Sequence, residues 1–115
     1  MLINNKWYLL NAKKHILYHD PIESLDASIL QNHILEPLLD IKNPRTDDRI
    51  DFVGGIRGLT ELEKLCNKSH RLAFALYPLS INSLFRVADS EHVMPPKCTW
   101  FEPKLRSGMV VRLLN

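Results

Sequence analysis

The apolar residues of this chain fall into short stretches separated by polar, turn-forming residues, and their spacing distinguishes strands from helices. Residues 6–10 combine aromatic and apolar side chains, which is typical of a strand, and Asn4 and Asn5 before them favour a turn. This pattern predicts that residues 6–10 form the second arm of a β-hairpin. A missing first arm would place the start of this chain inside a larger protein.

The first predicted helix follows Asp20 and Pro21. Asp20 or Ser24 can cap it. Pro37 should end or kink it near Glu36, because proline lacks a backbone N–H and crowds the preceding turn. The apolar residues of this stretch recur at helical spacing: Ala27, Leu30, Ile34 and Leu38.

The second predicted helix follows a strand and a glycine turn. Residues 49–53 have the apolar content of a short strand, which runs into residues 54–58, called here the glycine turn. Thr60, with Glu63 three residues later, fits the capping box of a helix N-terminus. The buried face of this helix should consist of Leu59, Leu62, Leu65 and Cys66.

The last third of the chain predicts a buried strand, a third helix and a hairpin. Residues 71–77 form a continuous apolar stretch closed by Pro78, as in a central strand. Ser80 can cap the third helix. Residues 99–102 and 109–114 can pair as a hairpin. The third helix should bury Leu84, Val87 and Ala88.

The order of these elements is strand, helix, strand, helix, strand, helix, strand, strand. The 115 residues lie within the usual size of one domain, so we expect a single module. The predicted class is α+β, with two layers, a mixed sheet of about four or five strands and three main helices.

Composition narrows the classes of function. The hydrophobic fraction is 45% and the charged fraction 24%, with apolar runs too short to span a bilayer, so we expect no membrane insertion. A net charge of +2 makes nucleic acid an unlikely partner on electrostatic grounds. Cys66 and Cys98 form neither a disulfide framework nor a metal-type pair, and the first residues have no export signal. We therefore expect a cytoplasmic protein without a metal site.

The positive charge of the chain is concentrated in residues 94–108 and the residues after them. Residues 94–115 contain four cations and one anion, whereas the remaining residues have a net charge of −1. We call residues 94–108 the basic loop. Lysines act as point charges for phosphate, and arginine offers a planar fork. The candidate anion ligands are Lys97, Thr99, Lys104 and Arg106, with Glu102 as a general base. The alternative is a basic hairpin with Trp100 and Phe101 as core side chains.

The glycine turn is a second candidate anion site. The free amides and the dipole of a helix N-terminus suit a phosphate or carboxylate. Gly54 and Gly55 would supply the amides, and Arg57 a bidentate contact. Asp51, just before the turn, is the other candidate for a general base or a metal-contacting carboxylate. The spacing matches neither the Rossmann nor the Walker pattern, and glycines are equally needed for any tight strand-to-helix turn.

Cys98 lies among cations in the sequence, where the pKa of a thiol can fall far enough to make a nucleophile. No base is evident beside it in the sequence. The alternative, which the sequence favours, is that Cys98 is a small polar filler.

Several separate blocks of the sequence agree in residue type, spacing and order with one known family. The strongest block runs from Trp100 to Gly108 within the basic loop, and the others are residues 24–31, 34–39, 44–47, 49–55 and 73–78. Over nearly its whole length the chain resembles the C-terminal part of the uncharacterised bacterial and archaeal family called domain of unknown function 1015. Members of that family are several times longer, so the resemblance implies a fragment that lacks the N-terminal portion.

The resemblance also has implications for fold and chemistry. The family is distantly similar to ParB- and sulfiredoxin-like folds, one branch of which phosphorylates free serine, and it has a weak association with serine metabolism. Cys98 stands where the family has serine, which implies a small hydrogen-bonding role for this side chain rather than a thiol nucleophile.

The residues and the resemblance together predict a module that binds a phosphorylated small molecule or a nucleotide through the basic loop and the glycine turn. Phosphoryl transfer is the candidate reaction, and the identity of any cofactor is left open. The alternative is a non-catalytic interaction module whose basic hairpin docks on a missing N-terminal domain or on a partner subunit, such as a second copy of the chain. Cations that converge on one pocket would favour the ligand, and cations consumed in ion pairs would favour docking.

Overall fold

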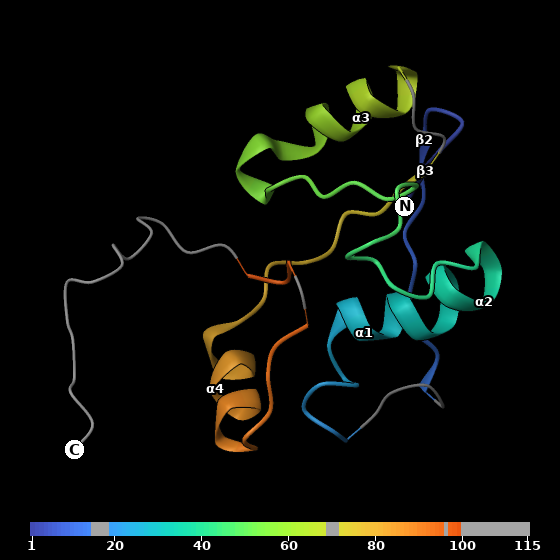
Figure 1. The fold of residues 1–115 in the computed structure, drawn as a ribbon. Helices are drawn as coiled ribbons and strands as arrows, with labels where there is room; N and C mark the ends of the chain where they lie inside the picture. The colour runs from blue at the N-terminus through green and yellow to red at the C-terminus, as the bar shows by residue number, and fades with distance from the viewer. Residues whose placement is uncertain (15–18, 69–71, 96, 100–115) are drawn as a thin grey trace, which may run out of the picture.

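The computed structural model of the chain describes residues 1–14, 19–68, 72–95 and 97–99. In these residues, three short strands form one antiparallel sheet, and the chain also forms three helical stretches (Figure 1). The class is α+β, as predicted. The mixed sheet of four or five strands is wrong, because the sheet has three strands in the order β2-β1-β3 and both pairings are antiparallel.

The sheet is built on an N-terminal hairpin. Strands β1 (Leu2–Ile3) and β2 (Lys6–Trp7) are joined by Asn4 and Asn5, which have φ angles of 49° and 58°. Positive φ at both central residues is the geometry of a type I′ turn, which asparagine tolerates. The first arm of the predicted hairpin is therefore β1 itself. Strand β3 (Leu72–Ala73) pairs with the other edge of β1, with Leu2 opposite Ala73.

The sheet has fewer strands than predicted because two segments that were expected to be strands differ in the structure. Residues 49–53 contain no strand, because Arg49 is bound to the turn before it and to the end of a helix. Of the predicted strand 71–77, residues 72–77 are described; among these only the two residues of β3 pair with the sheet, and Ala75 to Tyr77 are exposed. The predicted hairpin of residues 99–102 and 109–114 lies outside the described residues, apart from Thr99.

The first predicted helix is a continuous stretch of three parts: α1 (Asp26–Leu30), the π-helical turn η2 (Gln31–Leu35) and α2 (Glu36–Leu39). Pro37 does not end the stretch. Proline cannot donate to the carbonyl four residues before it, and the wider turn η2 directly precedes α2. Asp20 caps the turn before α1 rather than α1 itself, since its Oδ1 accepts from the Ile22 and Glu23 amides at 2.8 and 2.9 Å.

The stretch ends in a left-handed cap. Asp40 has a φ of 52°, and the amide of Ile41 donates to the carbonyl of Leu35 at 2.9 Å. The amide of Asp40 donates to the carbonyl of Glu36 at 3.1 Å, which is the bond of an αL cap, and a contact between flanking apolar side chains often accompanies such a cap. Leu35 and Ile41 are both buried. The cap therefore directs the chain after α2 into the turn that carries part of the candidate site.

The two remaining helices begin differently from each other. The short 3-10 turn η3 (Gly55–Arg57) leads directly into α3 (Gly58–Lys68), so α3 begins before Thr60 and the predicted capping position is wrong. Helix α4 (Ile81–Asp89) begins as predicted, with Ser80 Oγ accepting from the amide of Ser83 at 3.1 Å.

Helix α3 packs on the sheet, whereas α4 lies at the opposite side of the view (Figure 1). Trp7 of β2 donates from Nε1 to Glu63 Oε1 of α3 at 2.8 Å. In the described part of the chain, five apolar side chains are buried: Leu2, Leu25, Leu35, Ile41 and Val87. They come from β1, the helical stretch with its flanks, and α4. No helix among the described residues is long and apolar enough to span a membrane.

Candidate functional site

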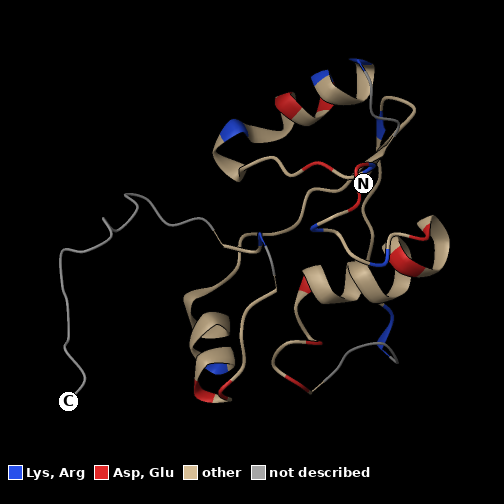
Figure 2. Cartoon of the chain, viewed as in Figure 1, with Lys and Arg blue, Asp and Glu red and all other residues tan. Residues whose placement is uncertain are grey.

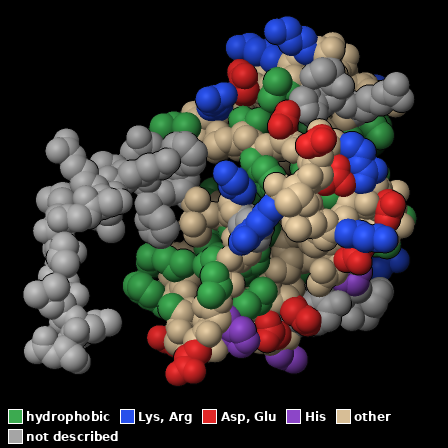
Figure 3. Space-filling view, viewed as in Figure 1, with side chains coloured by type: hydrophobic (Ala, Val, Ile, Leu, Met, Phe, Trp, Pro, Cys, Tyr) green, Lys and Arg blue, Asp and Glu red, His purple; other side chains and the backbone are tan. Residues whose placement is uncertain are grey.

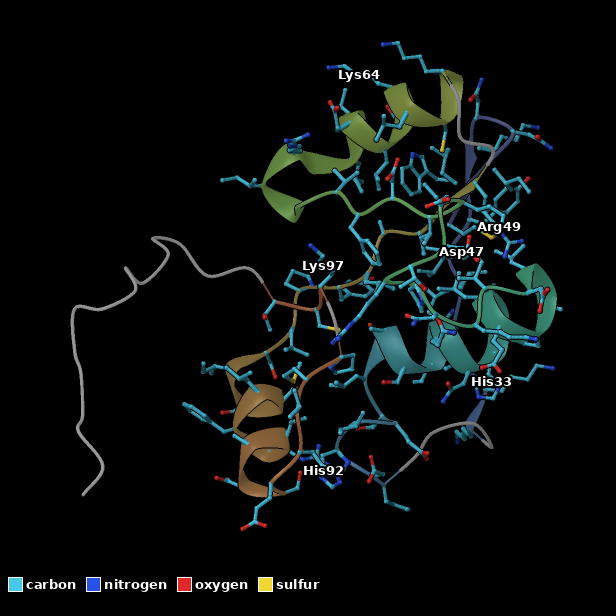
Figure 4. The ribbon with its side chains drawn as sticks, viewed as in Figure 1. His33, Asp47, Arg49, Lys64, His92 and Lys97 are labelled. Atoms are coloured by element: carbon cyan, nitrogen blue, oxygen red, sulfur yellow. The ribbon has the colours of Figure 1, made fainter. Side chains whose placement is uncertain are left out.

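A depression of about 550 Å³ lies between two segments that are far apart in the sequence. One wall is the turn and loop after α2, and the other is Lys97, which follows α4. Figure 4 shows Lys97 near the centre of the view and the pair Asp47 and Arg49 to its right, all three below α3. The lining residues are Pro44, Arg45, Thr46, Asp47, Asp48, Ile50, Asp51, Phe52 and Lys97.

Asn43 shapes the first wall. Its side-chain Oδ1 accepts from the amide of Arg45 at 3.1 Å, and its carbonyl accepts from the amides of Thr46 and Asp47, both at 3.2 Å. Asparagine before proline favours such a turn, because its side chain substitutes for a backbone acceptor. The turn leaves the side chains of Arg45 and Thr46 exposed at the depression.

An ion pair fixes this turn to the end of α2 (Figure 4). Arg49 Nη2 lies 2.6 Å from Asp47 Oδ2, and Arg49 Nε donates to Asp47 Oδ1 at 2.9 Å. The same guanidinium donates to the carbonyls of Leu39 and Asp40 at 3.0 and 2.9 Å. A cation at a helix C-terminus satisfies free carbonyls and complements the helix dipole. Arg49 therefore anchors the wall although it does not line the depression.

The pair also changes the charge of the wall. The hydrogen bond from the Arg49 guanidinium, followed by that from the Arg49 amide, lowers the pKa of Asp47 to about 2. The same contact raises the pKa of Arg49. Asp47 is thus ionised and already compensated. The remaining lining charges are the cations Arg45 and Lys97 and the carboxylates Asp48 and Asp51.

Two of the predicted site residues meet in this depression. Lys97 of the basic loop and Asp51, next to the glycine turn, both line it. Lys97 is exposed and has a φ of 61°, a left-handed conformation that is uncommon for lysine. Thr99 is exposed but does not line the depression. The other candidates of the basic loop, namely Glu102, Lys104 and Arg106, lie outside the described residues.

The glycine turn is placed elsewhere. Gly54, Gly55 and Arg57 do not line the depression, and lead instead into α3 through η3. Among the described glycines only Gly58 has a positive φ, of 69°, and Gly54 has an ordinary φ of −63°. A β-carbon at Gly55 would meet no atom within 4 Å. The turn into the helix therefore requires glycine at position 58, whereas position 55 has room for a side chain. The role of Gly54 and Gly55 as anion contacts stays a prediction.

The surroundings of Cys98 among the described residues do not favour an activated thiol. Burial raises its pKa, and the same cause raises the pKa of Cys66. A raised pKa reduces the thiolate fraction, which is the nucleophilic form. The structure therefore favours the role of a small filler for Cys98. Across the described ranges, no group of three or more His, Cys, Asp or Glu side chains is arranged to hold a metal ion.

Sequence reasoning missed four lining residues that the site uses: Arg45, Thr46, Asp48 and Phe52. The Asn43-Pro44 step before Arg45 and Thr46 was a readable turn signal, but it did not show that the turn meets Lys97. Phe52 looked like the apolar centre of a strand. It is instead 46% exposed at the edge of the depression.

Comparison of the chain with protein-family models, with curated proteins and with solved structures finds no match. The resemblance to the family called domain of unknown function 1015 stays a prediction.

Proposed function

We propose that this chain binds a phosphorylated small molecule in the depression between residues 44–52 and Lys97. The observation that carries the proposal is that Arg45 and Lys97, from distant parts of the sequence, line the same depression beside the hydroxyl of Thr46. Arginine supplies a planar fork, lysine a point charge and threonine a hydroxyl donor, which together suit phosphate oxygens.

The carboxylates of the depression fit this proposal. Asp47 is compensated by Arg49, so two cations face the two carboxylates Asp48 and Asp51. In phosphoryl transfer the protein mainly positions the groups and offsets charge, while a carboxylate accepts the proton of the attacking hydroxyl. Asp51 is the described residue that we assign to this proton transfer. Glu102 of the basic loop is the second candidate.

The wider context is part of the same proposal. Lys104 and Arg106, which lie outside the described residues, stay candidate anion ligands. The resemblance implies that a longer protein supplies a further wall. Both cysteines are free thiols, which supports a reducing compartment such as the cytoplasm.

A thermal-shift titration of the 115-residue chain with inorganic phosphate, pyrophosphate and ADP tests the proposal. The informative variant is Lys97→Asn, which removes the charge but keeps a residue that tolerates positive φ. The matched control is Lys13→Asn, since Lys13 is exposed and does not line the depression.

We expect at least one of these ligands to raise the melting temperature of the wild type and of Lys13→Asn. Lys97→Asn should bind it about tenfold more weakly or worse, as expected for the loss of a charge-assisted hydrogen bond. The proposal is wrong if none of the three ligands stabilises the wild type, or if the two variants bind equally well.

A second candidate function, an interaction module, is supported by one observation. Hydrophobic side chains gather over α4 (Figure 3), where Ile81 and Phe85 are 58% and 56% exposed. Sedimentation of the wild type and of Phe85→Asp over a range of concentrations tests it. Self-association that Phe85→Asp abolishes would favour this candidate, and a monomer at all concentrations would count against a second copy as the partner.

A further inference from the structure

The depression has a third chemical component besides its cations and carboxylates. Phe52 lines it and is 46% exposed, directly after Asp51 in the sequence. Single exposed apolar residues are common on protein surfaces, so exposure alone decides nothing. The position of Phe52 is what matters, because its ring borders the same depression as two cations. A half-exposed aromatic ring next to a phosphate-binding group is a surface on which a planar base can stack.

The carboxylates argue against the simplest phosphate ligands. Asp48 and Asp51 line the depression together with Arg45 and Lys97, so the wall is balanced in charge rather than strongly cationic (Figures 2 and 3). Carboxylates repel a bare phosphate ion. They accept hydrogen bonds from hydroxyl groups, and acidic side chains bind ribose hydroxyls in dinucleotide sites in this way. A ligand that suits this wall therefore has hydroxyl donors as well as phosphate.

We propose that the ligand of this site is a nucleotide, whose base stacks on Phe52, whose phosphates contact Arg45 and Lys97, and whose ribose hydroxyls donate to Asp48 or Asp51. This inference rests on the proposed function and names its ligand class. The three groups of the lining correspond to the three parts of a nucleotide. The volume of about 550 Å³ lies within the range of about 300–1,000 Å³ that is usual for small-molecule pockets.

Three probes separate the contributions: ADP has base, ribose and phosphates, ribose 5-phosphate lacks the base, and pyrophosphate lacks both base and ribose. Their affinities for the 115-residue chain are measured by isothermal titration at one salt concentration. The variant is Phe52→Ala, with Phe52→Tyr as the conservative replacement that keeps the ring. The matched control is Phe85→Ala, because Phe85 is similarly exposed but lies on α4, away from the depression.

We expect ADP to bind more tightly than either of the other probes. Phe52→Ala should weaken ADP by about fivefold or more, as expected for the loss of base stacking, and leave pyrophosphate unchanged. Phe52→Tyr and Phe85→Ala should bind ADP like the wild type. Circular dichroism of each variant confirms that it is folded.

The outcomes distinguish this inference from the proposed function. If pyrophosphate or ribose 5-phosphate binds as tightly as ADP, the nucleotide inference is overturned and phosphate binding stands. If Phe52→Ala weakens pyrophosphate as much as ADP, the ring does not act through the base, and the inference is again overturned. If no probe binds, both proposals fail.

Discussion

Replacing Leu2 with alanine tests whether the sheet depends on one buried side chain. Leu2 is 1% exposed on the central strand, opposite Trp7 on one side and Ala73 on the other. The substitution removes three carbons, which at about 0.8 kcal/mol each is a transfer loss of about 2.4 kcal/mol. The cavity left behind adds to this loss, and buried Leu→Ala changes cost about 2–5 kcal/mol in total. We expect a loss of about 3 kcal/mol.

Urea unfolding followed by circular dichroism measures the loss, and Leu38→Ala is its control. Leu38 is 72% exposed on α2, so the same chemical change there should alter the free energy of unfolding by about 0.5 kcal/mol or less. A loss of about 3 kcal/mol is a large share of the 5–15 kcal/mol that is typical of whole domains. The reasoning is refuted if both variants lose the same amount, or if Leu2→Ala unfolds at the urea concentration of the wild type.

Three further predictions concern side chains outside the core. Because the folded pKa of Asp47 is about 2 against an ordinary 3.8, its stabilisation is complete above about pH 4 and is lost as the pH falls through 2. As the pH is lowered over this range, the urea midpoint of Asp47→Asn should fall less steeply than that of the wild type. Equal slopes for the two proteins would contradict the prediction. Ser80→Ala should lower the free energy of unfolding by about 1 kcal/mol and Ser80→Asp should not, and equal urea midpoints would exclude a capping role. Cys98, in a Cys66→Ser background at pH 8, should react with iodoacetamide more slowly than free cysteine, and an equal rate would refute the raised pKa.

The parts of the fold that could be predicted depend on local signals. Asn4 and Asn5 marked the hairpin turn because asparagine tolerates the positive φ that a type I′ turn needs. Ser80 marked the start of α4 because its hydroxyl is a strong cap. Of the three residues predicted to form the buried face of α4, Val87 is buried, Leu84 is half-buried and Ala88 is exposed, so the spacing predicted that face only in part. Each of these signals involves residues that are close together in the sequence.

The sheet was predicted less well because strand pairing depends on distant contacts. Residues 49–53 have the content of a strand, but Arg49 binds the carbonyls of Leu39 and Asp40 and so holds this segment at the end of α2. The start of α3 was also predicted wrongly. Thr60 satisfies the pattern of a capping box, but the 3-10 turn η3 leads directly into α3, which begins at Gly58. A capping pattern shows that a helix is near, and the preceding turn decides where the helix begins.

The candidate site shows the same division between local and distant information. Lys97 was a candidate because positive charge is concentrated in the basic loop, and Asp51 was a candidate because it precedes the glycine turn. Both signals can be read from neighbouring residues in the sequence. Arg45 lines the same depression as Lys97 because the chain turns at Asn43 and is then fixed by the pair of Asp47 and Arg49, which the sequence did not show.

Arg49 is therefore a positioning residue for the depression. Asp47 lines the depression together with the candidate cations Arg45 and Lys97, but its carboxylate is bound by Arg49. Its guanidinium neutralises Asp47 and satisfies the end of α2 with the same set of donors. Without that pair, Asp47 would add the charge of a third carboxylate to a lining with two cations, and a phosphate would meet net repulsion there. The anion binding that we propose would thus depend on a contact that lies behind the wall of the depression.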